Sequence, residues 1–369
     1  MRIVLTGGGT GGHIFPLIAV AQALKGRAAQ RSQAPSIVVI GSCRRHRDSF
    51  EKNHIRCHHI ITGKVRRNFS LQTLFDIPLV FIGLVQSYWL LLWYMPDVVF
   101  SKGGYGAFPV VVIAWLFRIP VVSHESDSIT GLTNKILSRF TKNLLASFPS
   151  EQRDVIVVGN PVRDFRHTAD TEALHLRGNR PVLFVMGGSQ GASQINTLIF
   201  SLLHSLIQEY EVIHQAGKKN IREAQEASIE LPTHLRKQYH FYDFLDENEL
   251  KQAYAQCSLV VSRAGSGSLF EIALVGKPSI LIPFEFAAAG HQEKNATLYE
   301  KHGACVALNP RTVTAHTLHT TITTLMKDKS KRKSMSRAAH SFATPQATQD
   351  IVDIILQYDP LNASGKNSS

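Results

Sequence analysis

The sequence predicts an α/β protein with two domains, each built on a parallel β-sheet that helices cover on both faces. The chain has 369 residues, and a single domain usually has about 100 to 200, so the length indicates two cores. Short apolar runs typical of buried strands alternate with segments of helical periodicity, which is the pattern of a parallel sheet. The order strand, glycine loop, helix also occurs twice, once in each half of the chain.

The first half opens with a strand at 2–6, a glycine-rich loop at 7–12 and a helical pattern from residue 13. Segments rich in valine and isoleucine then predict three further strands. Helical patterns separate them, as expected when parallel strands are joined by crossovers. These strands are expected at 36–42, 97–101 and 119–125.

The same order returns in the second half, with a strand at 180–186, a glycine-rich loop at 187–192 and a helix at 193–208. We therefore interpret the chain as two Rossmann-like domains, which imply a cleft. Glycine and proline at 157–164 mark the place where one half gives way to the other. Further strands are expected at 210–217, 257–265 and 277–284. We expect domains at 1–162 and 163–344, a last helix at about 345–358 that packs back on the first domain, and a flexible tail at 360–369.

The charge of the chain indicates an anionic partner. Lysine and arginine outnumber aspartate and glutamate by 40 to 28, which gives a formal net charge of +12. Such an excess suits nucleic acid, an acidic lipid surface or a phosphorylated substrate. The sequence contains no RNA-recognition signature, zinc-finger spacing or helix-turn-helix pattern, so we expect no nucleic-acid partner.

The first residues and the cysteines predict a cytoplasmic protein. Met1 leads directly into an apolar strand, so no secretory signal is expected. The apolar stretch 77–94 is marginal in length for a membrane span and is interrupted by polar residues, proline and glycine, so we expect a helix partly buried in its domain. No two cysteines have C-x-x-C spacing, which indicates a reducing compartment. The four cysteines are Cys43, Cys57, Cys257 and Cys305.

The first glycine loop has the spacing of a dinucleotide site but lacks its acid. Gly7, Gly9 and Gly12 match G-x-G-x-x-G, which alone is a weak indication. An NAD site needs Asp or Glu at the end of the next strand to hold the ribose. Here that strand runs towards Arg44 and Arg45 instead. The two arginines leave an NADP-dependent oxidoreductase open as an alternative.

Both glycine loops put unpaired backbone N–H groups at a helix N-terminus, where hydrogen bonds and the helix dipole favour an anion. The dipole contributes only about 0.3 to 1 kcal/mol, so other contacts must supply most of the binding. A third glycine cluster, at 101–109, follows the strand at 97–101 and is expected on the same edge of the sheet. Three such loops fit a diphosphate on each side of the cleft better than they fit one dinucleotide.

Seven ordered motifs resemble those of the MurG family, the peptidoglycan N-acetylglucosaminyltransferases that convert lipid I to lipid II. They read GGGTGGHIFP, GGYGAFP, IPVVSHESDSITGLTNK, VVGNPVR, GGSQGA, SRAGSGSLFEI and HQEKNA. The resemblance implies a GT-B fold, in which two Rossmann-like domains face each other across a cleft. It also implies an inverting transfer of N-acetylglucosamine from UDP-N-acetylglucosamine to the muramyl 4-hydroxyl of lipid I, with no cofactor and no metal.

The resemblance places the acceptor side and the catalytic candidates in the first half. His13 is the first candidate for general base, because histidine titrates near neutrality and can take the proton of the attacking hydroxyl. The alternative is a histidine that only orders the loop or contacts phosphate. Glu125 and Asp127 are the other catalytic candidates, in a predicted loop that also holds Asn134. The family usually has H-E-Q-N here, so Asp127 departs from it and either shares the base role or faces a lysine such as Lys135.

The resemblance also assigns the substrate contacts. Arg163 corresponds to an arginine that meets the donor diphosphate, where a guanidinium can make two parallel hydrogen bonds; the alternative is a surface ion pair. Glu271 matches an acid that binds the ribose hydroxyls, and Gln292 lies where the family binds the hydroxyls of the donor sugar. The acceptor diphosphate is expected at Gly9, Thr10, Gly11, Gly103, Gly104 and Tyr105. The residues expected to contact UDP-N-acetylglucosamine are Thr10, Gly11, Gly12, His13, Asp127, Asn134, Arg163, Ser189, Gln190, Gly191, Arg263, Ser268, Glu271, His291 and Gln292.

A basic cluster beside an apolar segment indicates peripheral binding to an anionic membrane. The basic residues are Lys64, Arg66 and Arg67, and the apolar candidates are Phe75, Leu79, Ile82, Trp89 and Trp115. The alternative is that these side chains belong to an ordinary core. With the resemblance, the segment implies a location at the cytoplasmic face of the bacterial inner membrane, where lipid I and other cell-wall synthesis enzymes are expected partners. A catalytically silent nucleotide-binding scaffold is a further alternative.

Overall fold

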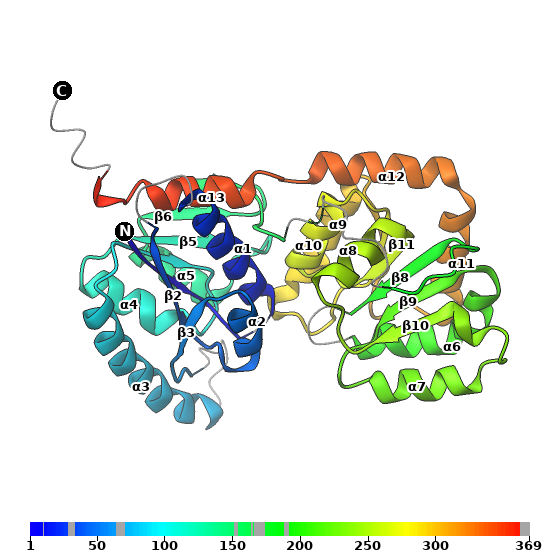
Figure 1. Cartoon of the computed structure of the whole chain (residues 1–369), viewed down its shortest axis with the longest axis horizontal. Helices are drawn as coiled ribbons and strands as arrows, with labels where there is room; N and C mark the ends of the chain where they lie inside the picture. Colours follow the sequence, from blue (N-terminus) through cyan, green and yellow to red (C-terminus); the bar gives the residue numbers. More distant parts are fainter. Residues whose placement is uncertain are drawn as a thin grey trace. The chain divides into compact units, whose positions relative to one another are not determined.

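The computed structural model describes residues 1–9, 11–28, 34–63, 71–150, 154–163, 165, 174–187 and 192–361. The chain forms two compact units (Figure 1). Unit 1 consists of Met1–Arg163 and Thr344–Ser369, and unit 2 consists of Asp164–Ala343. The domain boundaries expected after residues 162 and 344 each differ from these breaks by one residue.

Unit 1 contains a seven-stranded sheet of order β3-β2-β1-β4-β5-β6-β7 with all strands parallel. The strand order reverses at β1 and β4, and ligands of such sheets bind beyond the carboxyl ends of the strands at this point. The strands that were not expected from the sequence, β3, β6 and β7, are short, and β3 and β7 are mostly exposed or half-buried, so they lack a continuous apolar run. The strands are β1 (Arg2–Thr6), β2 (Ser36–Gly41), β3 (Arg56–His59), β4 (Val98–Ser101), β5 (Val121–Glu125), β6 (Asn143–Ala146) and β7 (Val155–Val157).

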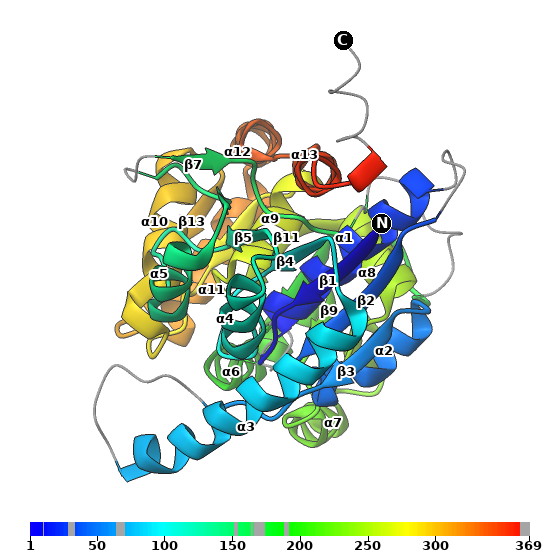
Figure 2. The same ribbon diagram turned by 90° about the vertical axis from the view of Figure 1, so that its left-hand side faces the viewer.

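Helices cover both faces of this sheet because alternate side chains of each strand point to opposite faces. Ile3 and Leu5 pack with α1 and α13 on one face, whereas Val4 packs with α3 and α4 on the other. Figure 2 shows α1 and α13 on the side of the sheet away from α3 and α4. The helices of unit 1 are α1 (Gly11–Ala28), α2 (Arg47–Lys52), α3 (Leu71–Tyr94), α4 (Phe108–Leu116), α5 (Leu132–Leu137) and α13 (Ala347–Leu356), with the short turns η1 (Arg44–His46) and η2 (Ser138–Phe140).

The final helix belongs to unit 1 although it follows unit 2 in the sequence. Ile351 and Ile355 of α13 are fully buried in the core formed with α1. An ion pair of 2.9 Å joins Arg27 to Asp353, and the Tyr358 hydroxyl donates a hydrogen bond to Asn143. The helix therefore completes the core of the first unit.

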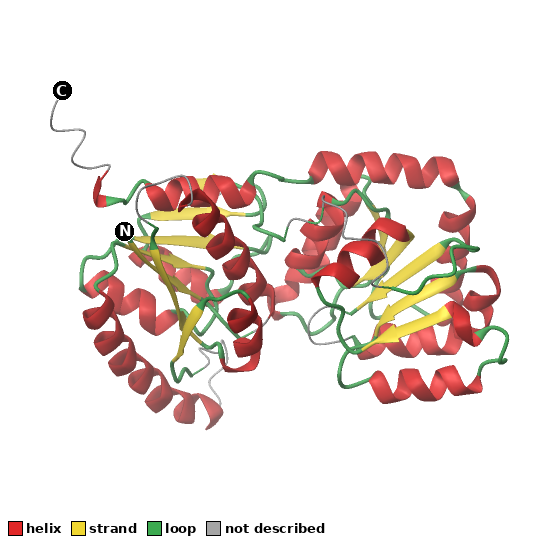
Figure 3. Ribbon diagram, in the orientation of Figure 1, coloured by secondary structure: helices red, strands yellow, loops and turns green. Residues whose placement is uncertain are grey.

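Unit 2 repeats the architecture with a six-stranded parallel sheet of order β10-β9-β8-β11-β12-β13 (Figure 3). Its strands are β8 (Val182–Met186), β9 (Glu211–Gln215), β10 (Tyr239–Tyr242), β11 (Cys257–Ser262), β12 (Ser279–Leu281) and β13 (Cys305–Ala307). Its helices are α6 (Ser193–Glu209), α7 (Ile221–Glu230), α8 (Glu247–Gln256), α9 (Ser266–Leu274), α10 (His291–Lys301), α11 (Ala315–Lys327) and α12 (Lys329–Phe342), with the short turns η3 (Arg236–Gln238) and η4 (Ala288–Gly290). The order again reverses beside the first strand of the unit, at β8 and β11.

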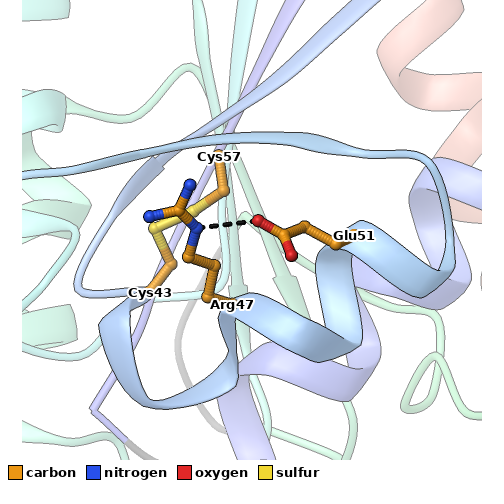
Figure 4. The surroundings of a disulfide bond; sticks show 4 residues. All are labelled: Cys43, Arg47, Glu51 and Cys57. Atoms are coloured by element: carbon orange, nitrogen blue, oxygen red, sulfur yellow. Dashed lines mark hydrogen bonds and ion pairs between the residues drawn. A yellow bond between two sulfur atoms is a disulfide. The ribbon is translucent and has the colours of Figure 1, made fainter.

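A disulfide links Cys43 to Cys57 in unit 1, with their Cα atoms 6.8 Å apart (Figure 4). Cys57 lies in β3 opposite Val39 of β2, and the turn after β2 places Cys43 beside it, although 14 positions separate the two cysteines in the sequence. Arg47 of α2 lies beside the bond and is paired with Glu51 at 2.7 Å. The spacing of the cysteines did not predict this link, and the expectation of a reducing compartment does not account for it.

Candidate functional site

The first and third glycine clusters pack against each other in unit 1. Gly9 has a φ of 98°, and a Cβ atom there would lie 2.4 Å from the Tyr105 ring. A Cβ atom on Gly104 would lie 3.3 Å from the His13 imidazole. His13 stands in the first turn of α1, which begins at Gly11. The structure thus brings together His13, Tyr105 and both clusters predicted to hold the acceptor.

Glu125 ends β5 and organises the loop that follows it. Its carboxylate accepts hydrogen bonds from the backbone N–H groups of Asp127 at 3.1 Å and Gly131 at 3.0 Å, and from Asn134 Nδ2 at 2.9 Å. Asn134 also closes on the third glycine cluster, because a Cβ atom on Gly103 would overlap its side-chain oxygen. Three accepted hydrogen bonds favour a role for Glu125 in ordering this loop.

The two neighbouring carboxylates have coupled charges. Burial raises the pKa of Glu125, and the Asp127 carboxylate raises it further, whereas the three hydrogen bonds act in the opposite direction. Asp127 is half-buried, and Lys135 is exposed on α5. A different lysine, Lys102, is electrostatically coupled to both carboxylates.

Lys102 is a residue of the site that the sequence interpretation missed. It follows β4 and is completely buried, with Nζ 2.5 Å from His124 Nδ1 and 2.8 Å from Asn160 Oδ1. Burial lowers its pKa to about 7, although Glu125 and Asp127 act to raise it. In the sequence, Lys102 could be noticed only as a lysine between a predicted buried strand and a pair of glycines. The sequence does not show that its side chain points into the core.

Arg163, the expected donor-diphosphate ligand, lies at the end of the first segment of unit 1. Its guanidinium carbon is 4.6 Å from the centroid of the Phe15 ring on α1, a cation–π contact that orients the side chain. Both residues are half-buried. The guanidinium is thus held beside α1, the helix that carries His13.

Part of the predicted set lies outside the described residues. This applies to Thr10 in the first loop and to Ser189, Gln190 and Gly191 in the second. The flanking elements have the expected order, because β8 ends at Met186 and α6 begins at Ser193. The second glycine loop therefore connects a central buried strand to a helix, as the first loop does.

Arg263 ties together the loops at the carboxyl edge of the second sheet. Its Nη1 group donates to Gln194 Oε1 at 3.0 Å and to the carbonyl oxygens of Pro283 at 2.7 Å and Ile282 at 3.2 Å. Its guanidinium carbon lies 5.4 Å from the Phe284 ring centroid. Burial lowers its pKa to about 10, so the group is still charged at neutral pH. The arrangement indicates that Arg263 supports the nucleotide pocket as a framework residue.

The N-terminus of α9 is open where the nucleotide is expected. A Cβ atom on Gly267 would meet nothing within 4 Å. Glu271 lies four residues after Gly267 and three residues after Ser268, so it shares a helix face with each of them. Glu271 is buried. Their alignment makes Ser268 and Glu271 neighbours on one side of the helix.

The beginning of α10 is fixed beside that of α9. Gln292 accepts a hydrogen bond from the Phe284 N–H at 2.9 Å, and its amide nitrogen would lie 3.9 Å from a Cβ atom on Gly265. Asn295, which the sequence interpretation did not single out, is fully buried and donates to the carbonyl before Gly265 at 3.1 Å. His291 is half-buried at the first position of α10. These contacts hold the starts of α9 and α10 beside each other, with Ser268, His291 and Gln292 near the two helix N-termini.

The α3 helix has one packed face and one exposed apolar face. Ser87 and Leu91 are fully buried, whereas only 17% of the apolar window Asp76–Tyr94 is buried, and this window is long and apolar enough to cross a membrane. The helix is thus less buried than expected. The exposed candidates are Leu79, Ile82, Trp89 and, on α4, Trp115, joined by Ile77, Phe81, Val85, Leu92, Trp93 and Leu116. Lys64, Arg66, Arg67 and the side chain of Phe75 lie outside the described part of the chain.

Acidic, histidine and cysteine side chains do not form a group of three that could hold a metal ion anywhere in the described segments. The described site residues predicted in unit 1 come from α1, the loops after β1 and β4, the end of β5 and the loop after it, α5, and the segment after β7. Those described in unit 2 come from the residue after β11 and from α9 and α10. Each set lies at the carboxyl edge of its own parallel sheet.

Two family models match the chain. The glycosyltransferase family 28 N-terminal domain matches residues 3–146, and the glycosyltransferase family 28 C-terminal domain matches residues 182–351. A protein of Treponema pallidum (strain Nichols) is 36% identical over 364 residues, covering 95% of this chain and 93% of its own. A protein of Legionella pneumophila (strain Paris) is 36% identical over 365 residues, covering 96% of both chains. Both are named UDP-N-acetylglucosamine–N-acetylmuramyl-(pentapeptide) pyrophosphoryl-undecaprenol N-acetylglucosamine transferase.

Solved structures agree with the architecture. The crystal structure of Acinetobacter baumannii MurG has a TM-score of 0.71 and 23% identity, covering 96% of this chain and 99% of that one. The UDP-GlcNAc 2-epimerase from Neisseria meningitidis bound to UDP-GlcNAc has a TM-score of 0.67 and 14% identity, covering 97% and 100%. These similarities and the two parallel-sheet units show a GT-B fold.

Proposed function

Because the chain belongs to the MurG family within glycosyltransferase family 28, we propose that it transfers N-acetylglucosamine from UDP-N-acetylglucosamine to lipid I, giving lipid II. The observation that carries the proposal is 36% identity over 95% of the chain to a transferase with this name. The site geometry supports it, since both units have a glycine loop leading from a central strand towards a helix. The same relationship argues against the NADP-dependent oxidoreductase.

Unit 2 is the proposed donor site. The open N-terminus of α9 suits a nucleotide, because its free backbone N–H groups favour an anion. The Glu271 carboxylate has two acceptor oxygens, which suit the two ribose hydroxyls. Gln292 offers an amide group to the donor sugar, while Arg263 holds the surrounding loops through three hydrogen bonds.

Unit 1 is the proposed acceptor site. The acceptor 4-hydroxyl oxygen attacks the anomeric carbon, a new C–O bond forms on the face opposite the departing UDP, and configuration inverts. His13 is the proposed base that receives the hydroxyl proton, which a neutral imidazole can accept. The glycine clusters around His13 would hold the acceptor diphosphate through backbone N–H groups.

The departing UDP takes both electrons of the broken glycosidic bond and gains negative charge. We expect Arg163 and the N–H groups at the start of α6 to stabilise this charge, because fixed donors are most effective where charge develops. Such donors are the reason for proposing a transfer that needs no divalent metal.

A transfer assay tests the proposal. Purified full-length protein is given radiolabelled UDP-N-acetylglucosamine and a short-chain lipid I, with and without EDTA, and the lipid product is separated and its new linkage analysed. We expect lipid II with an inverted anomeric centre and an undiminished rate in EDTA. Binding of UDP without sugar transfer would instead support the nucleotide-binding scaffold, and activity lost in EDTA but restored by Mg²⁺ would refute the metal-free step.

We also propose that α3 holds the protein on the cytoplasmic face of the membrane, where lipid I would be available. Its exposed face carries Phe81, Trp89 and Trp93, which are 66%, 64% and 86% exposed. Tyr88 contacts Phe117 just after α4, with ring centroids 5.1 Å apart, so the exposed end of α4 adjoins this face. Aromatic and aliphatic side chains on one helix face are typical of interfacial binding.

A further inference from the structure

None of the roles proposed above involves Lys102, the buried lysine that follows β4. Lys102 is 0% exposed, yet the next three residues form the glycine cluster that contacts Asn134, His13 and Gly9. Its backbone N–H donates to the Thr6 carbonyl at the end of β1 at 2.8 Å. The side chain therefore lies directly beneath the proposed acceptor loops without reaching their surface.

The two closest partners of the ammonium group are uncharged. Burial and the nearby Lys102 charge hold the pKa of His124 well below its usual value, so this imidazole is neutral. Its Nε2–H donates to the Gly159 carbonyl at 2.8 Å, which leaves Nδ1 to accept from Lys102. The other partner is the side-chain oxygen of Asn160. A buried cation with only neutral hydrogen-bond partners is costly unless charges of opposite sign lie near.

Those opposite charges are Glu125 and Asp127. Both carboxylates act to raise the pKa of Lys102. Their mutual repulsion disfavours the state in which both are ionised. Lys102 contacts His124 of β5 and Asn160 after β7, while the charges of Glu125 at the end of β5 and Asp127 in the following loop act on it through space. One buried cation thus offsets two carboxylates beside the expected position of an acceptor diphosphate.

We propose that Lys102 is a positioning residue for the acceptor half of the reaction: from beneath the glycine cluster it holds in place the loop that carries Glu125 and Asp127, with a charge opposite to theirs. Through His124 and Asn160 it also joins this loop to the end of the first segment of unit 1. The inference rests on the proposed function, because it assigns a role in the same acceptor site. Lys102 itself touches no substrate.

A double-mutant cycle in the full-length protein tests the charge balance. The variants are Lys102→Met, Asp127→Asn and the combination, with Lys142→Met as a matched control, since Lys142 is an exposed lysine of the same unit. We expect Lys102→Met to lower kcat/KM for lipid I at least tenfold and to move the acidic limb of its pH profile upward. The affinity for UDP should remain unchanged, because α9, which we propose to hold the nucleotide, lies in unit 2.

Adding Asp127→Asn to Lys102→Met should raise kcat/KM at least threefold above that of Lys102→Met, because it removes one of the two carboxylates that repel each other. If Lys102→Met does not fold, folding of the double variant gives the same support. Strictly additive effects, an unshifted pH profile in a folded Lys102→Met protein, or a double variant that is equally unfolded would overturn the proposal. Failure of the proposed function is distinguishable, because the unmodified protein would then transfer no sugar to lipid I.

Discussion

Gly9 lies where the loop after β1 meets Tyr105, and a methyl group on Gly9 would be 2.4 Å from that ring. Its φ of 98° is also one that side chains other than glycine rarely adopt. The loop that leads into α1 and His13 can approach Tyr105 only because glycine meets both of these constraints. The chemistry expected of the loop therefore depends on an absent side chain.

Gly9→Ala is expected to destabilise the protein by about 1 to 3 kcal/mol, from backbone strain and overlap with Tyr105. It should also weaken binding of lipid I more than binding of UDP, which we assign to unit 2. Chemical unfolding and separate ligand titrations measure the two effects. Gly26→Ala is the control, because a Cβ atom at Gly26 in α1 meets nothing within 4 Å and should be neutral or stabilising. Equal effects of the two substitutions would contradict the assignment.

His214 makes the stability of unit 2 dependent on pH. It is buried, with Nδ1 2.9 Å from the Tyr239 hydroxyl and Nε2 3.0 Å from Asn196 Oδ1, and burial lowers its pKa from 6.5 to about 3. Above pH 6.5 neither the folded nor the unfolded state is protonated at this residue. Between pH 6.5 and about 3 only the unfolded state takes the proton. The contribution is thus complete above pH 6.5 and is lost as the pH falls.

The free energy of unfolding of unit 2 should therefore fall by up to about 1.4 kcal/mol per pH unit below pH 6.5 because of this one group. Denaturant unfolding measured from pH 7 to pH 4 checks the slope. His214→Gln should reduce it, whereas His204→Gln, at an exposed position of α6, should not. Unchanged slopes in both variants would count against the neutral buried histidine.

At the scale of elements, α3 combines a packed face with an exposed apolar one. Phe81→Ser combined with Trp89→Ser removes two side chains that are 66% and 64% exposed, so the fold should change little while vesicle binding falls at least fivefold. Flotation with liposomes containing anionic lipid measures the binding. Ile229→Ser is the control, because Ile229 is 60% exposed but lies on α7 of unit 2. Undiminished flotation of the double variant would exclude this face as the membrane contact.

The disulfide is an element-scale constraint because it connects the end of β2 to β3. A crosslink that closes a loop of about 15 residues stabilises by about 3 kcal/mol in chain-entropy estimates. Reduction, or Cys43→Ser, should therefore lower the thermal stability of unit 1. Cys257→Ser in unit 2 is the comparison, since that cysteine has a free thiol. Titration of four free thiols in protein that was denatured without a reductant would show that the link does not form.

At the scale of the whole chain, unit 1 is assembled from two distant segments. Residues of α13, including Ile351 and Ile355, belong to the same core as α1. Truncation after Ala343 should expose that core and increase hydrogen exchange in α1 and β1, while the β8 and β9 amides of unit 2 stay protected. Truncation after Leu361 keeps α13 and serves as the control. Equal protection of unit 1 in both truncated proteins would show that α13 is dispensable.

The sequence by itself determined the two parallel-sheet units, the positions of the glycine loops in the chain and the presence of a last helix. These follow from local patterns: buried parallel strands read as apolar runs, and a glycine loop between strand and helix has one plausible geometry. The short edge strands β3 and β7 were missed because exposed strands carry no such run. His13, Glu271 and Gln292 were selected because their motifs resemble those of the family, and their roles stay predictions.

Only the tertiary structure decided which side chains meet. Lys102, His124 and Asn160 come from three segments that pack together at one edge of the sheet. Cys43 meets Cys57 because β2 pairs with β3 and the chain turns directly after β2. A residue type and its spacing do not specify whether a lysine points to solvent or into the core, because the direction depends on strands and loops distant in the sequence. The chemistry of single residues is therefore readable from local sequence, whereas their charge states and partners arise from long-range packing.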